Sequence, residues 1–278
     1  MTETDTQIQP RKTGLTRRQK RRLSRAAQYA VFVAAVVAFA AAADWGRLKN
    51  QFAQAHIAEQ MFPDVITVAL KNTVLYTLSG FVVGLALGMV IALMRLSSVG
   101  PYRWVAGIYI EIFRGLPALL IFIFVGVGVP LAFPDIQYPG GTYGKVAVAL
   151  GLVSAAYMAE TIRAGIQAVP KGQMEAARSL GFSPARAMIS IIIPQAFRII
   201  LPPLTNELVL LFKDSSLVLF LGVTLEEREL SKFGNDLAST TANSTPILVA
   251  GLCYLLITIP LGFVVRRMES NSTKEAIR

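Results

Sequence analysis

The chain has 278 residues, of which 54% are hydrophobic and only 16% charged, and its mean hydropathy is +0.53. This composition is more apolar than that of soluble globular domains and indicates an integral membrane protein. The formal net charge is +10, but the basic residues are divided between a tail and loops, without the basic stripe and interleaved aromatic residues of nucleic-acid binders. The single cysteine, Cys253, excludes a disulfide framework or a thiolate metal site within one chain.

Six apolar segments come close to the about 20 residues that a helix needs to cross a hydrocarbon layer of about 30 Å. Four of them lack Asp, Glu, Lys and Arg: residues 26–43, 73–94, 115–134 and 246–265. The other two, residues 145–169 and 195–221, carry ionisable groups, so we expect them to line a pathway or contact partner helices. The sequence predicts an all-α, polytopic bundle of six transmembrane helices over residues 26–267, between a basic tail of residues 1–25 and a C-terminal tail of residues 268–278.

The basic residues also predict the orientation of the bundle. Most of them lie on one side if both tails and the polar insert of residues 169–194 are cytoplasmic, as the positive-inside bias requires. Residues 1–24 are then a disordered tail near anionic lipid, and residues 44–64 and 222–245 are extracytoplasmic. The first span also fits a cleaved signal peptide ending at Ala41-Ala42-Ala43, although the apolar run is long for one, and a retained anchor gives the same topology.

The second span carries a small-residue stripe and two hydroxyl groups. Gly80, Gly84 and Gly88 recur at a spacing of four, which predicts close packing against another helix. Thr73 and Thr77 lie one turn apart near the outer end, where their hydroxyls could donate to a substrate. Hydrogen bonds to the preceding turn of the helix are the alternative.

The insert of residues 169–194 has the punctuation of two short helices. Good helix formers from Gln173 to Leu180 precede Gly181, which stands where a left-handed cap would end the first helix. Ser183 and Pro184 then have the residue types of an N-cap and a first helical position. Two helices meeting at Gly181 would project from the membrane, which predicts a docking site for a soluble partner.

This insert resembles the EAA loop of permease subunits of bacterial ABC importers. The pattern is Glu175-Ala176-Ala177, three residues, Gly181, nine residues, Ile191, one residue and Ile193-Pro194, with Ile193 where the family most often has Leu. Further segments, at residues 109–117, 156–165 and 194–217, are similar to the polar amino acid uptake branch of that family, which includes histidine, glutamine and glutamate permeases. The resemblance covers about residues 73–267.

The resemblance implies a type I ABC importer fold, a bacterial cell membrane location and three kinds of partner. These are a second permease subunit, identical or related, two ATP-binding subunits that hold ATP and Mg²⁺, and an extracytoplasmic substrate-binding protein. It also implies that the chain is a transport subunit without an ATPase site of its own. The residues that it implies for coupling to the ATPase are Gly172, Glu175, Ala176, Ala177, Gly181 and Pro194.

Polar residues within the last spans are the candidates for a substrate pathway. Glu207 lies about 13 Å beyond Arg198 along the fifth span, near mid-depth, and it shares one helix face with Asp214. Asn206 and Lys213 share the neighbouring stripe. The full set of candidates is Thr73, Thr77, Tyr157, Glu160, Asn206, Glu207, Lys213, Asp214 and Ser216.

Several of these candidates have a structural alternative. An ion pair between Glu160 and Arg163 would fasten the end of the fourth span, and Glu111 with Arg114 resembles the family's ion pair at the inner surface. The acidic and basic candidates together leave the charge of the substrate open. Together with the resemblance, the sequence predicts an ATP-driven importer of a polar amino acid that works by alternating access, and the direction of transport rests on the resemblance alone. An ion-gradient-driven secondary transporter or channel and a membrane scaffold are the alternatives.

Overall fold

The computed structural model describes residues 17–276, and all regular elements within that range are helical. The chain forms two compact units, Met1–Asn50 and Gln51–Arg278. Five helical segments are long and apolar enough to cross a membrane, and a bent pair of helices makes a sixth candidate span. The prediction of an all-α, polytopic bundle is confirmed.

The first unit is dominated by α1 (Arg17–Ala42), in which no residue is buried within the chain. The expectation of a disordered tail over residues 1–24 is wrong for its last part, because residues 17–24 belong to this helix. Their Arg, Lys, Gln and Leu side chains are good helix formers and extend the apolar helix at its N-terminal end. Residues 1–16 lie outside the described range. The segment after α1 contains α2 (Trp45–Phe52) and, in the second unit, α3 (Ala55–Gln60).

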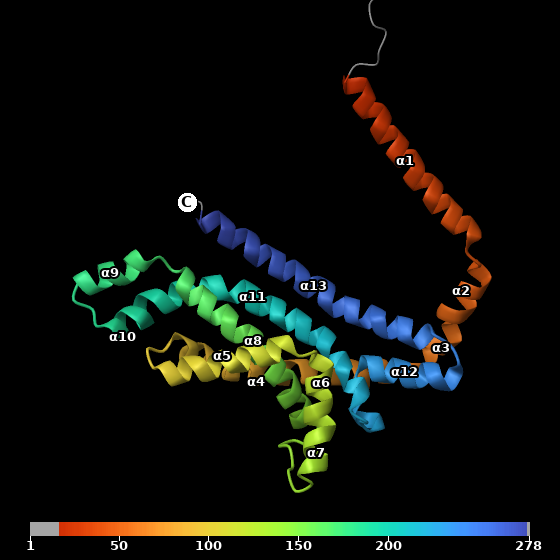
Figure 1. Cartoon of the computed structure of the whole chain (residues 1–278). Helices are drawn as coiled ribbons and strands as arrows, with labels where there is room; N and C mark the ends of the chain where they lie inside the picture. The colour runs from red at the N-terminus through yellow and green to blue at the C-terminus, as the bar shows by residue number, and fades with distance from the viewer. Residues whose placement is uncertain (1–16, 277–278) are drawn as a thin grey trace, which may run out of the picture. The chain divides into compact units, whose positions relative to one another are not determined.

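Four long helices build the second unit: α4 (Lys71–Leu96), α8 (Thr142–Ala168), α11 (Ile193–Asp214) and α13 (Thr245–Ala276) (Figure 1). A π-helical turn, Val65–Leu70, leads into α4, and a 3₁₀ segment, Ser215–Phe220, continues α11. The glycine stripe of α4 packs on α8 as predicted. A Cβ atom at Gly84 would lie only 2.1 Å from Ser154 Oγ, and one at Gly80 would lie 2.6 Å from Leu150 Cβ.

The third predicted span is not one straight helix over residues 115–134. Helix α5 (Gly100–Gly115) ends at an extended residue, Leu116, and the chain then turns by 105° into α6 (Ala118–Ile123), a π-helical segment (Phe124–Gly128) and α7 (Val129–Ala132). The break follows from Pro117, which disfavours a helical conformation for the residue before it. Counted as one candidate span, this bent pair begins with α5, which the sequence analysis placed before the membrane.

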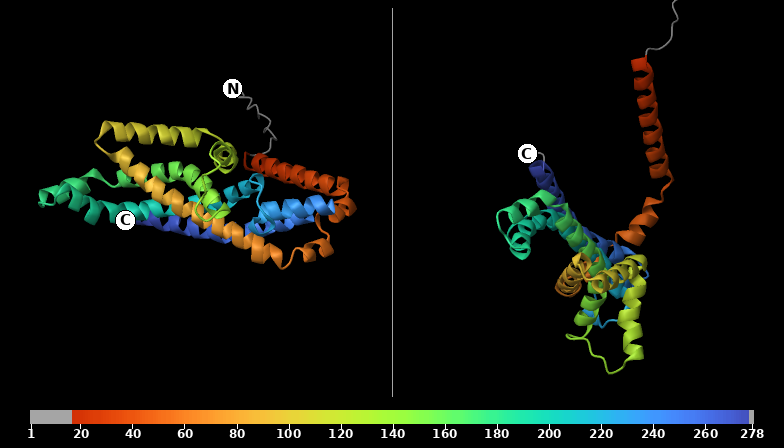
Figure 2. Two further views of the ribbon diagram at one scale, coloured as in Figure 1. Left: turned by 90° about the horizontal axis from the view of Figure 1, so that it is seen from below. Right: turned by 60° about the vertical axis from the view of Figure 1, so that its left-hand side comes forward.

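The polar insert forms one end of the second unit. It consists of α9 (Lys171–Ser179) and α10 (Pro184–Ala187), and a π-helical segment (Met188–Ile192) joins α10 directly to α11. Another short helix, α12 (Leu230–Thr241), lies beside α13 at the opposite end of the unit (Figures 1 and 2). The two ends are joined by the long helices, with the middle of α8 and α11 halfway between them.

Candidate functional site

A cavity of about 310 Å³ lies between α6, α8 and α11. Two of its lining residues are carboxylic acids, so we call it the acidic cavity. The lining consists of Ala118, Val153, Ser154, Tyr157, Glu207, Leu210, Leu211 and Asp214.

The lining follows from helix periodicity. Glu207, Leu210, Leu211 and Asp214 have the spacing i, i+3, i+4 and i+7, which places them on one face of α11. Glu207 is about 21 Å from the first residue of α11, and Tyr157 is about 22 Å from the first residue of α8. The acidic cavity is thus about midway along α8 and in the last third of α11, whose last residue is Asp214.

The cavity brings together three of the predicted pathway residues, Tyr157, Glu207 and Asp214. Asn206 and Lys213 lie on the neighbouring stripe of α11, are exposed and do not line it. Ser216 also lies outside the lining. With two carboxyl groups and no Lys or Arg among its lining residues, the cavity is suited to cationic groups of a ligand.

The predicted pair of Glu111 with Arg114 is absent from the described residues, and Arg114 stacks on Tyr157 instead. The Arg114 Cζ atom lies 5.4 Å from the centroid of the Tyr157 ring. This contact follows from the position of α5 along α8. The Tyr109 hydroxyl of α5 donates to the Leu152 carbonyl oxygen of α8 at 2.7 Å. Because α5 runs along the middle of α8, its C-terminal Arg114 arrives beside the cavity.

Three other predicted pathway residues are held in contacts of the scaffold. The Thr73 hydroxyl donates to Ala69 O at 2.9 Å and accepts a hydrogen bond from Leu230 N at 3.1 Å, while the Thr77 hydroxyl donates to Thr73 O at 2.8 Å. Glu160 forms the ion pair with Arg163 at 2.7 Å that was the structural alternative. All three lie outside the lining of the acidic cavity.

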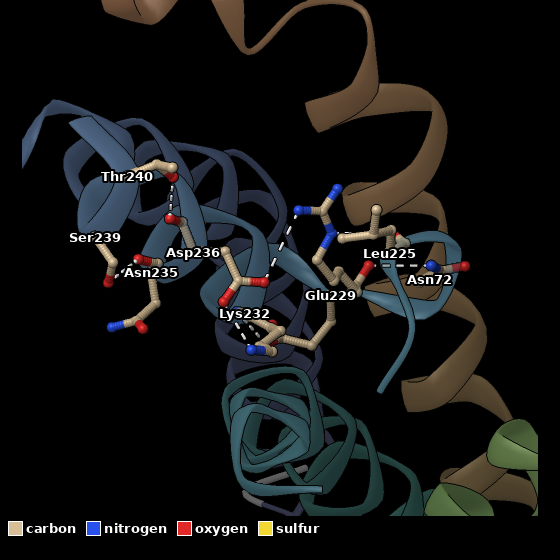
Figure 3. Close-up of polar contacts among 9 residues, drawn as sticks. Asn72, Leu225, Glu229, Lys232, Asn235, Asp236, Ser239 and Thr240 are labelled. Atoms are coloured by element: carbon tan, nitrogen blue, oxygen red, sulfur yellow. Dashed lines mark hydrogen bonds and ion pairs between the residues drawn. The ribbon is translucent and has the colours of Figure 1, made fainter. Parts of the chain in front are cut away.

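A polar network at the α12 end attaches the segment of residues 224–230 to α4. The Asn72 amide donates to the carbonyl oxygens of Glu226 at 2.7 Å and Arg228 at 3.0 Å, and the Tyr76 hydroxyl donates to Glu227 O at 2.8 Å. Figure 3 shows Asn72 reaching this segment from α4. These bonds join the start of the second span to the segment that follows the fifth.

Glu229, which the sequence analysis did not single out, belongs to the same segment and is the N-cap residue of α12. Its carboxylate accepts hydrogen bonds from Ser231 N and Lys232 N, each at 2.6 Å, and from the Tyr254 hydroxyl at 2.7 Å. Lys232 in turn pairs with Asp236 at 2.7 Å (Figure 3). The sequence carries no clear signal for this role, because the preferred N-cap residues are Ser, Thr, Asp and Asn rather than Glu.

The polar insert forms a bent pair of helices that we call the coupling elbow, residues 171–187. Gly181 has a φ of +83°, and Phe182 N donates to Ala177 O at 3.1 Å, which is the predicted left-handed cap at the end of α9. Ser183 Oγ accepts a hydrogen bond from Arg186 N at 3.3 Å, so the predicted N-cap is confirmed. The second helix is the start of one helical stretch, Pro184–Phe220, that continues through α11.

One face of the coupling elbow is attached to the bundle and the other is exposed. Ala177 is buried, Met174 packs against the main hydrophobic core, and Gln195 of α11 donates to Gln173 at 3.5 Å. Of the residues implied in coupling, Gly172, Glu175, Ala176, Gly181 and Pro194 are exposed and Ala177 is not. Leu180, at the tip, is 77% exposed.

Within the described residues, no group of three His, Cys, Asp or Glu side chains could hold a metal ion.

Residues 84–273 match the family model described as binding-protein-dependent transport system inner membrane component. The chain is 38% identical over 196 residues to the arginine transport system permease protein ArtQ of Bacillus subtilis (strain 168), an alignment that covers 68% of this chain and 86% of the relative. It is 39% identical over 203 residues to the probable glutamine ABC transporter permease protein GlnM of the same organism, covering 72% and 91%. The solved structure of an amino acid ABC transporter with histidines matches with a TM-score of 0.68 and 34% identity, over 77% of this chain and 96% of that one.

Proposed function

The chain belongs to the family of binding-protein-dependent transport system inner membrane components, the permease subunits of ABC importers, and on that premise we propose that it carries a cationic amino acid across a bacterial inner membrane. The observation that carries this proposal is the continuous helical stretch of Pro184–Phe220. It begins in the coupling elbow and, in its second half, contributes Glu207 and Asp214 to the acidic cavity. Movement at the elbow would therefore be transmitted directly to the wall of the cavity.

The class of substrate follows from the charge of the cavity. An amino acid with a basic side chain carries two cationic groups, and Glu207 with Asp214 offers two carboxyl groups. An acidic amino acid would bring a further negative charge to the same site, which electrostatic repulsion disfavours. Relatives named for arginine transport, ArtQ among them, fit this choice of substrate.

The coupling elbow is the proposed contact with the ATP-binding subunits, which would hold ATP and Mg²⁺. Its exposed residues offer a small-residue surface at Gly172 and Ala176, a carboxylate at Glu175 and an apolar tip at Leu180. We place this end and both termini in the cytoplasm, and the α12 end outside, facing a substrate-binding protein. A second permease subunit, identical or related, would complete the pathway.

Transport by the reconstituted complex tests the proposal. The chain is co-reconstituted into proteoliposomes with its ATP-binding subunits and binding protein, and uptake of radiolabelled arginine, glutamine and glutamate is measured. We expect uptake that requires hydrolysable ATP and Mg²⁺ on the elbow side and that prefers arginine. Uptake that continues without nucleotide hydrolysis, under an ion gradient, would contradict the proposal and favour a secondary transporter.

A further inference from the structure

Arg114 is a cation that lies close to the acidic cavity. It is the penultimate residue of α5, beside the break of the third span, and its guanidinium lies over the ring of Tyr157, a lining residue of the acidic cavity. Ala118, four residues further along the chain, lines the same cavity.

The hydrogen-bonding capacity of Arg114 is largely unused within the described residues. Its side chain is exposed, and apart from the contact with Tyr157 it makes no hydrogen bond or ion pair there. A guanidinium has five N–H donors and a geometry that matches a carboxylate. An arginine that retains free donors beside a cavity is a candidate for ligand binding.

The other cations near the cavity are less suited to this role. Arg163 is engaged by Glu160 at 2.7 Å and by Gln167. Lys213 lies on the stripe of α11 that does not line the cavity. Arg114 is therefore the one nearby cation in the described part of the chain that combines proximity with free donors.

Every free amino acid carries an α-carboxylate, and the two acidic residues of the cavity would repel it. The lining supplies only the hydroxyls of Ser154 and Tyr157 as side-chain donors. We propose that Arg114 binds the α-carboxylate of the transported amino acid, while Glu207 and Asp214 bind its cationic groups. This inference rests on the proposed function and names the residue that would make the site selective for amino acids over amines.

Binding of arginine and of argininamide, in which the α-carboxylate is replaced by a neutral amide, tests this role. The probes are titrated into the full-length chain with its ATP-binding subunits in lipid nanodiscs, without the binding protein, so that only the membrane site selects. We expect arginine to bind about 10- to 100-fold more tightly than argininamide, as one charge-assisted contact implies. In Arg114→Gln, arginine should lose that advantage, so that the ratio of the two dissociation constants falls to about one.

Two further variants separate a binding role from a structural one. Arg114→Lys keeps the charge and should retain part of the preference for arginine. Arg103→Gln, on the same helix, removes a guanidinium that donates to Ser97 O and Ser98 O, and should leave the ratio unchanged. An Arg114→Gln complex that assembles normally and keeps the wild-type ratio would overturn the inference, as would a wild-type complex that binds both probes equally. ATP-dependent uptake by the wild type, measured separately, shows whether the proposed function itself holds.

Discussion

Glu229 illustrates how a single buried carboxyl group can link the stability of this chain to pH. Its side chain is fully buried at the start of α12, outside the membrane-spanning helices. Burial raises its pKa from 4.5 to about 7, against the opposing effect of the Tyr254 hydroxyl, two backbone N–H groups and the nearby Lys232. The folded protein therefore holds this proton more tightly than the unfolded chain does.

The raised pKa of Glu229 predicts the direction in which stability changes with pH. The stabilisation linked to the proton is fully present below the unfolded pKa and is lost as the pH rises through about 7. At most this amounts to on the order of 3 kcal/mol, so the melting temperature in detergent should fall by up to about 6 to 12 °C between pH 5 and pH 8. Glu229→Gln should remove most of that slope, whereas Glu226→Gln, at an exposed position nearby, should keep it. If the melting temperatures of the wild type and of Glu229→Gln fell equally between pH 5 and pH 8, the raised pKa of Glu229 would be contradicted.

Residue spacing predicted part of the site, for identifiable reasons. Glu207 and Asp214 are seven residues apart, so helix periodicity alone places them on one face, and Tyr157 was among the candidates. The approach of Arg114 to Tyr157 depends on how far α5 runs along α8, and the sequence carries no local signal for that. Ser154 was missed because a single serine in an apolar helix has no distinguishing pattern.

At the scale of elements, the coupling elbow depends on the conformation of Gly181. Its φ is +83°, and no atom lies within 4 Å of the position that a Cβ atom would take, so any side chain here is strained by its own backbone rather than by a neighbour. A β-branched residue would favour another conformation and change the angle between α9 and α10. The elbow should then fit its partner poorly.

The variant Gly181→Val, compared with Gly222→Val, tests the elbow. Gly222 has a φ of +64° and equally open surroundings, but it lies in the segment before α12, away from the elbow. Both substitutions should lower stability by about 1–3 kcal/mol. Only Gly181→Val should reduce binding of the ATP-binding subunits and ATP-driven uptake, by at least about tenfold, as measured by co-purification and flux. Equal loss of flux in both variants would show that backbone strain in general, and not the elbow, is responsible.

Strong local signals made the elbow predictable, and their weakness elsewhere explains the error in the third span. Gly181, Ser183 and Pro184 each specify a backbone conformation. The structure has the expected caps at the end of α9 and at the start of α10. In the third span, hydropathy marks an apolar run but not its direction, so the 105° turn at Pro117 was not foreseen. A proline close to the start of an apolar segment is compatible with both a helix start and a break within a longer span.

At the scale of the whole molecule, the second unit has two chemically different ends joined by long helices. One end carries the coupling elbow, and the other carries α12 with the network around Glu229 (Figure 1). The acidic cavity lies between them, about midway along α8 and in the last third of α11. Under the proposed function, this arrangement suits alternating access, in which one end receives mechanical work and the other admits substrate.

Cysteine accessibility tests the proposed orientation of the two ends. In a Cys253→Ser background, single cysteines are introduced at Ser179 in the elbow and at Ser239 in α12, both exposed. In sealed cells, a membrane-impermeant maleimide should label the Ser239→Cys variant, and it should label Ser179→Cys only after the inner membrane is opened. Labelling of Ser179→Cys in intact cells would reverse the orientation.

The central claim is that the carboxyl groups of the acidic cavity bind the transported cation, and arginine uptake by Glu207→Gln tests it most directly. The variant is measured in proteoliposomes with wild-type ATP-binding subunits and binding protein, beside Glu226→Gln as an exposed control. Loss of one charge-assisted contact should lower the efficiency of arginine uptake by about 10- to 100-fold, with assembly retained and the control unaffected. Arginine uptake by Glu207→Gln at the wild-type rate and apparent affinity would contradict the account.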